Sequence, residues 1–293
     1  MLTHLYSGGA FFIKGLAEAV YTSCKIHGFP QAVAGNSSGA LVAAVGAVKG
    51  FSFMYDAALS IDLQTAHKHK AFTNEGKLSI WSILRVVFGF SPVNQDIRPI
   101  LKKLISYTDF LAYQDDANKV KCFVLTADID DAVPTLWEIH NLESYELFLD
   151  ILEASCRMQG MCEPILLPDH TGELCAHWDG GQFDHIPTGI FTRVKPSEVV
   201  AFYTRSEHYE LESKQMMQKG AFARLMRMIE IDNQEKSKND QYKIKDICED
   251  RDIRLYEVFI ERVLEHFYDN DKDRQFEQIE AGREAALKTF KQV

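Results

Sequence analysis

The chain has 293 residues, of which 46% are hydrophobic and 25% are charged, and its formal net charge is −10. These proportions are ordinary for a globular protein and exclude a disordered composition, and no uncharged run approaches the roughly 20 residues that a membrane span needs. The acidic balance argues against a nucleic acid partner, because duplex binding depends on lysine and arginine neutralising phosphates.

Cysteine usage and the N-terminal residues predict a cytoplasmic protein. The six cysteines are scattered and form no close Cys-x-x-Cys pair of the kind that holds zinc, so we expect buried free thiols and no metal. Cys175, His177 and His185 could be assembled into a metal site, but their spacing is not a standard one. The apolar stretch over 11–20 contains two charged residues and follows no basic segment, which disfavours a signal peptide.

The N-terminal part of the chain predicts two successive strand-loop-helix units. The expected elements are a strand over 2–6, a helix over 13–26, a strand over 31–34 and a helix over 40–48. A glycine-containing loop separates strand from helix in each unit, Ser7-Gly8-Gly9 in the first and Gly35-Asn36-Ser37-Ser38-Gly39 in the second. Two such units in succession indicate a parallel sheet covered by helices.

The rest of the chain continues the mixture of strands and helices. Residues 51–113 look mainly helical, and the chain from Tyr209 onward looks helical and rich in charge. Between them the pattern predicts strands over 121–126, 135–139, 173–178 and 198–203 and a helix over 144–157. We therefore expect the α/β class, with a mostly parallel central sheet between helices, in a single domain over 1–293 whose C-terminal region is helical from about residue 209.

Ser37 is the candidate nucleophile. It falls between a predicted strand and a predicted helix, which is the context of a nucleophile elbow. A sharp turn there would strain the serine backbone, and side chains at Gly35 and Gly39 would collide with neighbouring chain. The helix that begins at Ser38 would point its amide dipoles at developing negative charge. The alternative is an ordinary strand-to-helix turn.

Two further turns supply the other parts of a candidate site. Gly8 and Gly9 follow the first strand, where bare backbone amides can approach a carbonyl oxygen, so this loop is a candidate oxyanion hole. Asp179 ends a predicted strand before Gly180-Gly181, where its carboxylate could stand beside the elbow as a base. Taken alone, each could instead be a plain turn.

Histidine is the usual base for a serine nucleophile, and two histidines flank Asp179. His177 lies on the same strand face as Asp179, so a triad is conceivable. It would lie about two residues farther from the elbow than Asp179 does. Asp184 is interpreted as a loop carboxylate.

These segments together resemble the patatin-like phospholipase family. The family combines a glycine-rich oxyanion loop, a Gly-x-Ser-x-Gly elbow and an Asp-Gly-Gly or Asp-Gly-Ala motif, and this chain has Ser7-Gly8-Gly9-Ala10, Gly35-Asn36-Ser37-Ser38-Gly39-Ala40 and Asp179-Gly180-Gly181 in the same order. Similar features elsewhere are Thr126-Ala127-Asp128, Ala154-Ser155-Cys156, Pro164, Pro187 and Gly282-Arg283-Glu284-Ala285-Ala286. The chain departs from the family at Ala10-Phe11-Phe12-Ile13, where a third glycine and a basic residue are common.

The resemblance implies a three-layer patatin-like fold and a lipid acyl hydrolase, such as a phospholipase A or a lysophospholipase-like esterase. Ser37 and Asp179 would form a catalytic dyad that works through an acyl-enzyme, with no cofactor. The amides of Gly8, Gly9 and Ser38 would hold the oxyanion. The substrate would be a lipid or another ester.

Other functions share these residues and stay open. A thioesterase or an acyltransferase would use the same dyad, and a catalytically silent lipid-binding or interaction protein would keep the same fold. The apolar residues 78–90 and the helix over 216–231 could contact a membrane surface transiently, although core packing explains both as well. Phe11 and Phe12 could line an acyl channel or face the core, and we favour the core.

Overall fold

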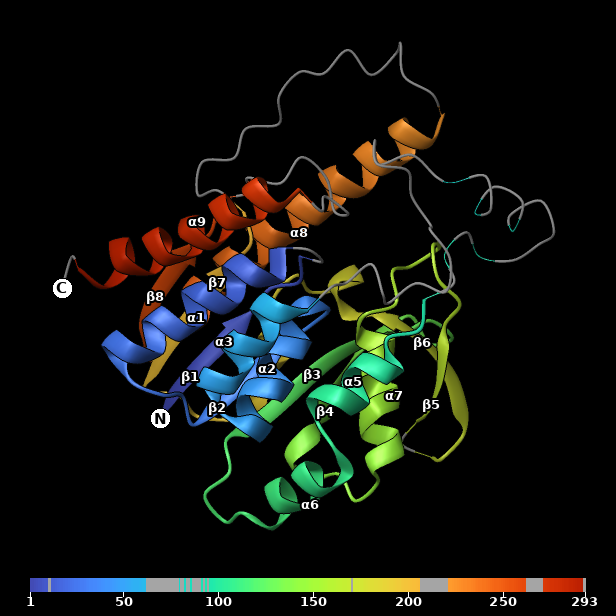
Figure 1. The fold of residues 1–293 in the computed structure, drawn as a ribbon, viewed down its shortest axis with the longest axis horizontal. Coiled ribbons are helices and arrows are strands. Elements are labelled where there is room, and N and C mark those ends of the chain that lie inside the picture. Colours follow the sequence, from blue (N-terminus) through green and yellow to red (C-terminus); the bar gives the residue numbers. More distant parts are fainter. Residues whose placement is uncertain are drawn as a thin grey trace.

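The computed structural model describes residues 1–9, 12–61, 95–169, 171–205, 221–261 and 271–291, together with residues 79, 82, 85, 91 and 93 (Figure 1). Three predictions therefore fall wholly or largely outside the described residues. These are the conformation of Ala10 and Phe11, the lipid contact of 78–90, and the lipid contact of 216–231, where side chains up to residue 230 are not described.

An eight-stranded sheet forms the centre of the molecule, with strand order β5-β6-β3-β2-β1-β7-β8 and with β4 paired to β3 outside this path. The strands are β1 (Leu2–Tyr6), β2 (Ala32–Gly35), β3 (Lys121–Asp128), β4 (Val133–Glu138), β5 (Ile165–Pro168), β6 (Leu174–Asp179), β7 (Glu198–Tyr203) and β8 (Arg254–Phe259). Parallel pairing joins β3, β2, β1, β7 and β8, whereas β4 and β6 are antiparallel to β3 and β5 is antiparallel to β6. The sheet is mostly parallel, as predicted.

Helices and short turns cover both faces of the sheet (Figure 1). The described helices are α1 (Ile13–His27), α2 (Ser38–Lys49), α3 (Phe51–Ser60), α5 (Arg98–Leu104), α6 (Tyr107–Asp115), α7 (Tyr145–Ser155), α8 (Ala221–Asp250) and α9 (Lys272–Phe290). Along β7, Val200 and Phe202 join the core cluster that includes α1, α2, α7 and α9, whereas Val199 and Tyr203 join a second cluster with α8. This alternation is the period of a strand buried on both faces. The layers are consistent with a patatin-like three-layer architecture.

The C-terminal region is not wholly helical, so that prediction was wrong in part. Arg254–Phe259 forms β8, which extends the sheet beside β7. Charged residues interrupt the apolar pattern of β8, because the strand lies at the edge of the sheet. There Arg254 donates to Glu198 at 2.6 Å, and Glu257 accepts from Gln241 at 2.8 Å. The sequence prediction also omitted β5, a short strand at the opposite edge.

The crossing of α1 with α9 brings two helix backbones into contact. A Cβ atom on Gly282 would lie 2.1 Å from the carbonyl oxygen of Gly15, and one on Gly15 would lie 2.6 Å from the carbonyl oxygen of Gln278. Beside this contact, Arg283 donates to the buried carboxylate of Glu18 at 3.0 Å. Glycine at both positions therefore sets the separation of the two helices.

Membrane spanning requires a helix that is both long and apolar. No helix in the described part of the chain meets both conditions.

Candidate active site

The elbow and the Asp179 motif meet because two strands share one edge of β3. β4 pairs with β3 from Phe123 to Asp128 and so occupies the other edge. On the shared edge, β2 pairs as far as Gly35, which lies opposite Val124, and β6 pairs as far as its last residue, Asp179, which lies opposite Thr126. Because β2 is parallel to β3 and β6 is antiparallel to it, their C-terminal ends point toward each other. Residues distant in the sequence are thus placed end to end.

The backbone at Ser37 has the strained conformation expected of a nucleophile elbow. Its φ is 52° and its ψ is −129°, in a region that favours glycine and costs of order 1 to 3 kcal/mol for another residue. The flanking glycines make the turn sterically possible. A Cβ atom on Gly35 would lie 2.2 Å from the carbonyl oxygen of Gly39, and one on Gly39 would lie 2.6 Å from the carbonyl oxygen of Tyr6.

Ser155, at the end of α7, braces the elbow. Its hydroxyl accepts the backbone N–H of Ser37 at 3.0 Å and donates to the carbonyl of Leu125 at 2.8 Å. Leu125 is the residue of β3 between the stretches paired with β2 and β6, so the hydroxyl fills the gap between the two strand ends. Cys156 adds a weak S–H donor to the Ser37 carbonyl at 3.5 Å. The sequence marked Ser155 only through the familial Ala-Ser-Cys segment, without a role.

The Asp179 carboxylate contacts the Ser37 hydroxyl and has an altered affinity for protons. It accepts hydrogen bonds from the Ser37 side chain and from the backbone N–H of Gly181, the latter at 2.9 Å. Burial raises its pKa from 3.8 to about 6, although these two hydrogen bonds act in the opposite direction. The carboxylate is therefore ionised near neutral pH but is more basic than an ordinary aspartate, as a general base should be.

Unpaired backbone donors lie beside Ser37. Gly8 and Gly9 are buried, and Gly8 packs so closely that a Cβ atom on it would lie 2.9 Å from the Ser37 Cβ. The Thr204 hydroxyl donates to the Gly8 carbonyl at 2.5 Å. Because the C=O and the N–H of a trans peptide point in opposite directions, the Gly9 N–H points away from Thr204. Among the described residues, the N–H groups of Gly8, Gly9 and Ser38 donate to no acceptor. Buried donors without acceptors are rare, and here they suit an oxyanion.

His177 is held away from Ser37 by other partners. Register places it opposite Asp128, two residues farther from the strand junction than Asp179. Its Nδ1 lies 3.0 Å from the Thr126 hydroxyl, and its Nε2 lies 3.8 Å from an Asp128 carboxylate oxygen. Burial lowers the pKa of the imidazole. The structure thus brings Asp179, and not His177, to the serine hydroxyl.

The loop after Asp179 is held by hydrogen bonds that the sequence did not predict. Asn36, within the elbow, donates through its side-chain amide to the backbone carbonyl of Asp184 at 3.0 Å. The Asp184 carboxylate accepts from Thr188 at 3.0 Å, in keeping with its interpretation as a loop residue. From α8, the Asp240 carboxylate accepts the N–H of Ile186 at 3.1 Å. The contacts of Asn36 and Asp240 cross between distant segments, so no sequence pattern links them to this loop.

Two other sequence features have a clear position in the structure. Phe12 is 2% exposed, as expected for a core residue. Ligand atoms of Asp128, Asp130 and Cys175 lie within 4.8 Å of one another. The two carboxylates already accept backbone N–H groups around their own turn and from β6, which accounts for their position without an ion.

Comparison with known proteins supports the fold. No protein-family model matches the sequence, and no curated protein matches it. Among solved structures, the chain is similar to the crystal structure of VipD from Legionella pneumophila, with a TM-score of 0.51 and 11% sequence identity. The match covers 99% of this chain and 66% of that chain, so this chain spans just under two thirds of the other. The likeness supports the α/β fold, with its mostly parallel sheet between helices, and it extends to the fold alone.

Proposed function

We propose that this protein is a serine acyl hydrolase that cleaves lipid or other carboxylic esters with a Ser37–Asp179 dyad. One observation carries the proposal. A serine in a strained elbow donates to a carboxylate whose pKa is raised to about 6, beside backbone donors that have no acceptor among the described residues. A structural turn needs neither the raised basicity nor the unpaired donors.

The proposed reaction has two halves. Asp179 takes the hydroxyl proton as the Ser37 oxygen attacks the ester carbonyl, and it then passes that proton to the departing alcohol. The resulting acyl-enzyme is hydrolysed when Asp179 takes a proton from water and the hydroxide equivalent attacks the acyl carbon. The bond between the acyl carbon and the Ser37 oxygen then breaks, the carboxylic acid leaves, and Asp179 returns the proton to the Ser37 oxygen. The N–H groups of Gly8, Gly9 and Ser38 stabilise the oxyanion in both halves, and one such donor contributes about 10² to 10³ in rate. No cofactor enters either half.

A fluorophosphonate probe tests the nucleophile directly. The purified protein is expected to form a covalent adduct on the peptide that contains Ser37 and to hydrolyse short p-nitrophenyl esters. Ser37→Ala should abolish both, whereas the exposed Ser52→Ala should retain both. Labelling at another serine, or undiminished hydrolysis by Ser37→Ala, would refute the assignment.

The same dyad could serve an esterase, a thioesterase or an acyltransferase. These classes differ in the group that leaves the acyl carbon and in the molecule that accepts the acyl group. A thioesterase would prefer acyl thioesters over oxygen esters, and an acyltransferase would pass the acyl group to an added alcohol faster than to water. We favour ester hydrolysis in the cytoplasm, with transient contact at a lipid surface. Phospholipid vesicles and acyl thioesters, compared as substrates of the same preparation, separate these classes.

A further inference from the structure

Three polar side chains on one face of α8 hold residues that follow the strands β6 and β7. Ser237, Asp240 and Gln241 stand at positions i, i+3 and i+4 of the helix, so they lie on the same side of it. Ser237 is 1% exposed and Asp240 is 5% exposed. Polar groups that are buried this deeply keep specific hydrogen-bond partners, and the partners of these three lie in two loops of the candidate active site.

Asp240 holds the far end of the loop that begins at Asp179. One oxygen of its carboxylate accepts the backbone N–H of His185 at 2.5 Å and that of Ile186 at 3.1 Å. Within the loop, the Gly180 carbonyl accepts two more backbone N–H groups, at 3.0 Å and 3.2 Å. The carboxylate of α8 therefore fixes one end of a compact turn whose other end carries the proposed base.

The other two polar side chains hold Arg205, which comes after β7. Arg205 donates through Nε to the Ser237 hydroxyl at 2.7 Å and through a terminal nitrogen to the Gln241 side-chain oxygen at 2.6 Å. The residue before it, Thr204, donates its hydroxyl to the Gly8 carbonyl and so orients that peptide, whose N–H is a candidate oxyanion donor. One helix face therefore supports both the loop of the base and the loop of the donors.

We propose that Asp240 is a positioning residue for the Ser37–Asp179 dyad, because its carboxylate oxygen holds the loop after β6 where the base faces the serine hydroxyl. The inference rests on the proposed function. Asp240 acts through the backbone N–H groups of residues 185 and 186, not on the substrate. A carboxylate that is held in line with the serine hydroxyl accepts its proton at each turnover, so a loosened loop slows the reaction itself more than it weakens binding.

The loop needs an acceptor oxygen from Asp240 and does not need a full negative charge. Burial, and then the nearby Asp184 carboxylate, raise the pKa of Asp240 to about 7, although the two N–H groups and Lys243 act in the opposite direction. The group is therefore only partly ionised near neutral pH. An asparagine amide oxygen accepts the same N–H groups without a charge, so Asp240→Asn is the conservative variant and Asp240→Ala is the disruptive one.

Asp240→Ala is expected to lower kcat on short p-nitrophenyl esters about tenfold and to leave KM almost unchanged. It should also move the acid limb of the kcat/KM profile to lower pH by roughly one unit, because burial raises the pKa of Asp179 and a loosened loop admits water to it. Asp240→Asn should restore both kcat and the position of the limb. An Asn variant as slow as the Ala variant would overturn the proposal.

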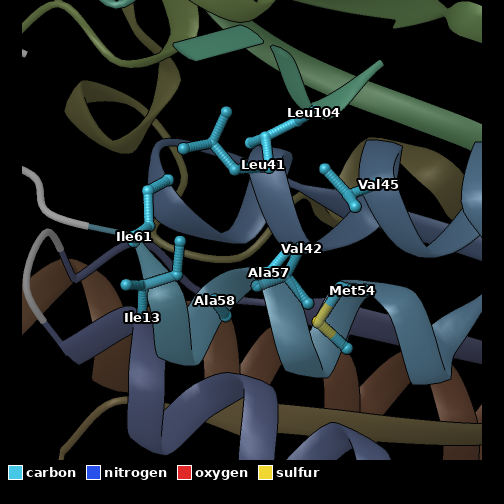
Figure 2. Close-up of a pocket in the computed structure, with 9 residues that line it drawn as sticks. All are labelled: Ile13, Leu41, Val42, Val45, Met54, Ala57, Ala58, Ile61 and Leu104. Carbon is cyan, nitrogen blue, oxygen red and sulfur yellow. The ribbon is translucent and has the colours of Figure 1, made fainter.

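A core substitution away from both loops controls for loss of stability. Met54 of α3 is 2% exposed and lines a small crevice with Val42 and Val45, and every residue of this lining is apolar (Figure 2). Met54→Ala should lower the denaturation midpoint, as core truncations do, yet keep kcat per folded molecule and the acid limb unchanged. A limb that moved equally in Met54→Ala would show that instability alone shifts it, and would overturn the positioning role.

The outcomes separate this inference from the function on which it rests. If hydrolysis requires Ser37 but Asp240→Ala keeps the kcat and the pH profile of the unchanged protein, the positioning role is refuted and the hydrolase stands. If no ester is cleaved, amide hydrogen exchange over residues 180–186 decides whether Asp240 holds the loop. Faster exchange in Asp240→Ala, reversed in Asp240→Asn and absent in Met54→Ala, supports the hold, and equal exchange in all variants refutes it.

Discussion

The elbow at Ser37 and the crossing of α1 with α9 both depend on glycine. In each region a Cβ atom would come within 2.6 Å of a backbone carbonyl oxygen. At the crossing of Gly15 with Gly282, the helices are regular and the neighbouring Glu18 carboxylate accepts from Arg283. At the elbow, the serine backbone has positive φ and nearby N–H groups donate to no described acceptor.

The difference between the elbow and the helix crossing shows what distinguishes a candidate site from close packing. Glycine at a tight contact shows only that two backbones approach each other. Strain, unpaired donors and a carboxylate with raised pKa each cost stability, and they coincide at the elbow. Substitutions at the two regions should therefore separate activity from stability.

Asp179→Asn should lower kcat/KM about 10⁴-fold, because the amide cannot accept the serine proton. At about pH 8 the same change should raise the free energy of unfolding by about 1 to 2 kcal/mol, after allowance for partial exposure of the carboxylate. The folded pKa of about 6 lies above the ordinary value of 3.8, so the ionised group destabilises the folded state above pH 6, and this cost disappears below about pH 4.

Denaturant titration at about pH 8 and about pH 4 measures the difference in the free energy of unfolding between Asp179→Asn and the unchanged protein. The pH dependence of kcat/KM tests the activity. In the unchanged protein, kcat/KM should fall about tenfold per pH unit below about 6. A profile that is flat through this range, or an Asn variant that is less stable at high pH, would contradict the assigned environment of Asp179.

Ser155→Ala should lower kcat roughly tenfold and leave KM almost unchanged. The variant leaves the Ser37 N–H and the Leu125 carbonyl without their bridging hydroxyl, which should cost about 1 to 3 kcal/mol in stability. Ser155→Thr restores the hydroxyl and is expected to recover part of the rate. Initial rates of both variants, measured at equal concentrations of folded protein, give kcat and KM. Full activity in Ser155→Ala would show that the Ser155 hydroxyl is not needed to hold the elbow.

Gly282→Ala should lower stability by about 2 kcal/mol or more and change kcat/KM of the folded protein less than twofold. The added methyl would displace α9 from α1, as overpacking does in other cores. The exposed Glu284→Ala, on the same helix, is the matched control and should be nearly neutral. Thermal unfolding and active-site titration distinguish the two effects, and a large loss of activity per folded molecule would couple this crossing to the site.

The two strand-loop-helix units were predictable from sequence because hydrophobic runs and glycines determine them locally. The end-to-end meeting of β2 and β6 was not, since it depends on the register of two distant strands on β3. The role of Ser155 was not predicted for the same reason, because it exists only across the gap at Leu125. β8 was missed because Arg254 and Glu257 find partners in neighbouring elements and so break the apolar pattern.

The shared edge of β3 has a consequence for when the protein becomes reactive. A growing chain contains Ser37 early, but the carboxylate that would activate it arrives only after residue 179 has been made and β6 has docked against β3. A fragment that ends before Leu174 would carry the nucleophile without its base. If Ser37 and Asp179 form the proposed dyad, the order of synthesis would thus keep an unfinished chain from reacting with esters.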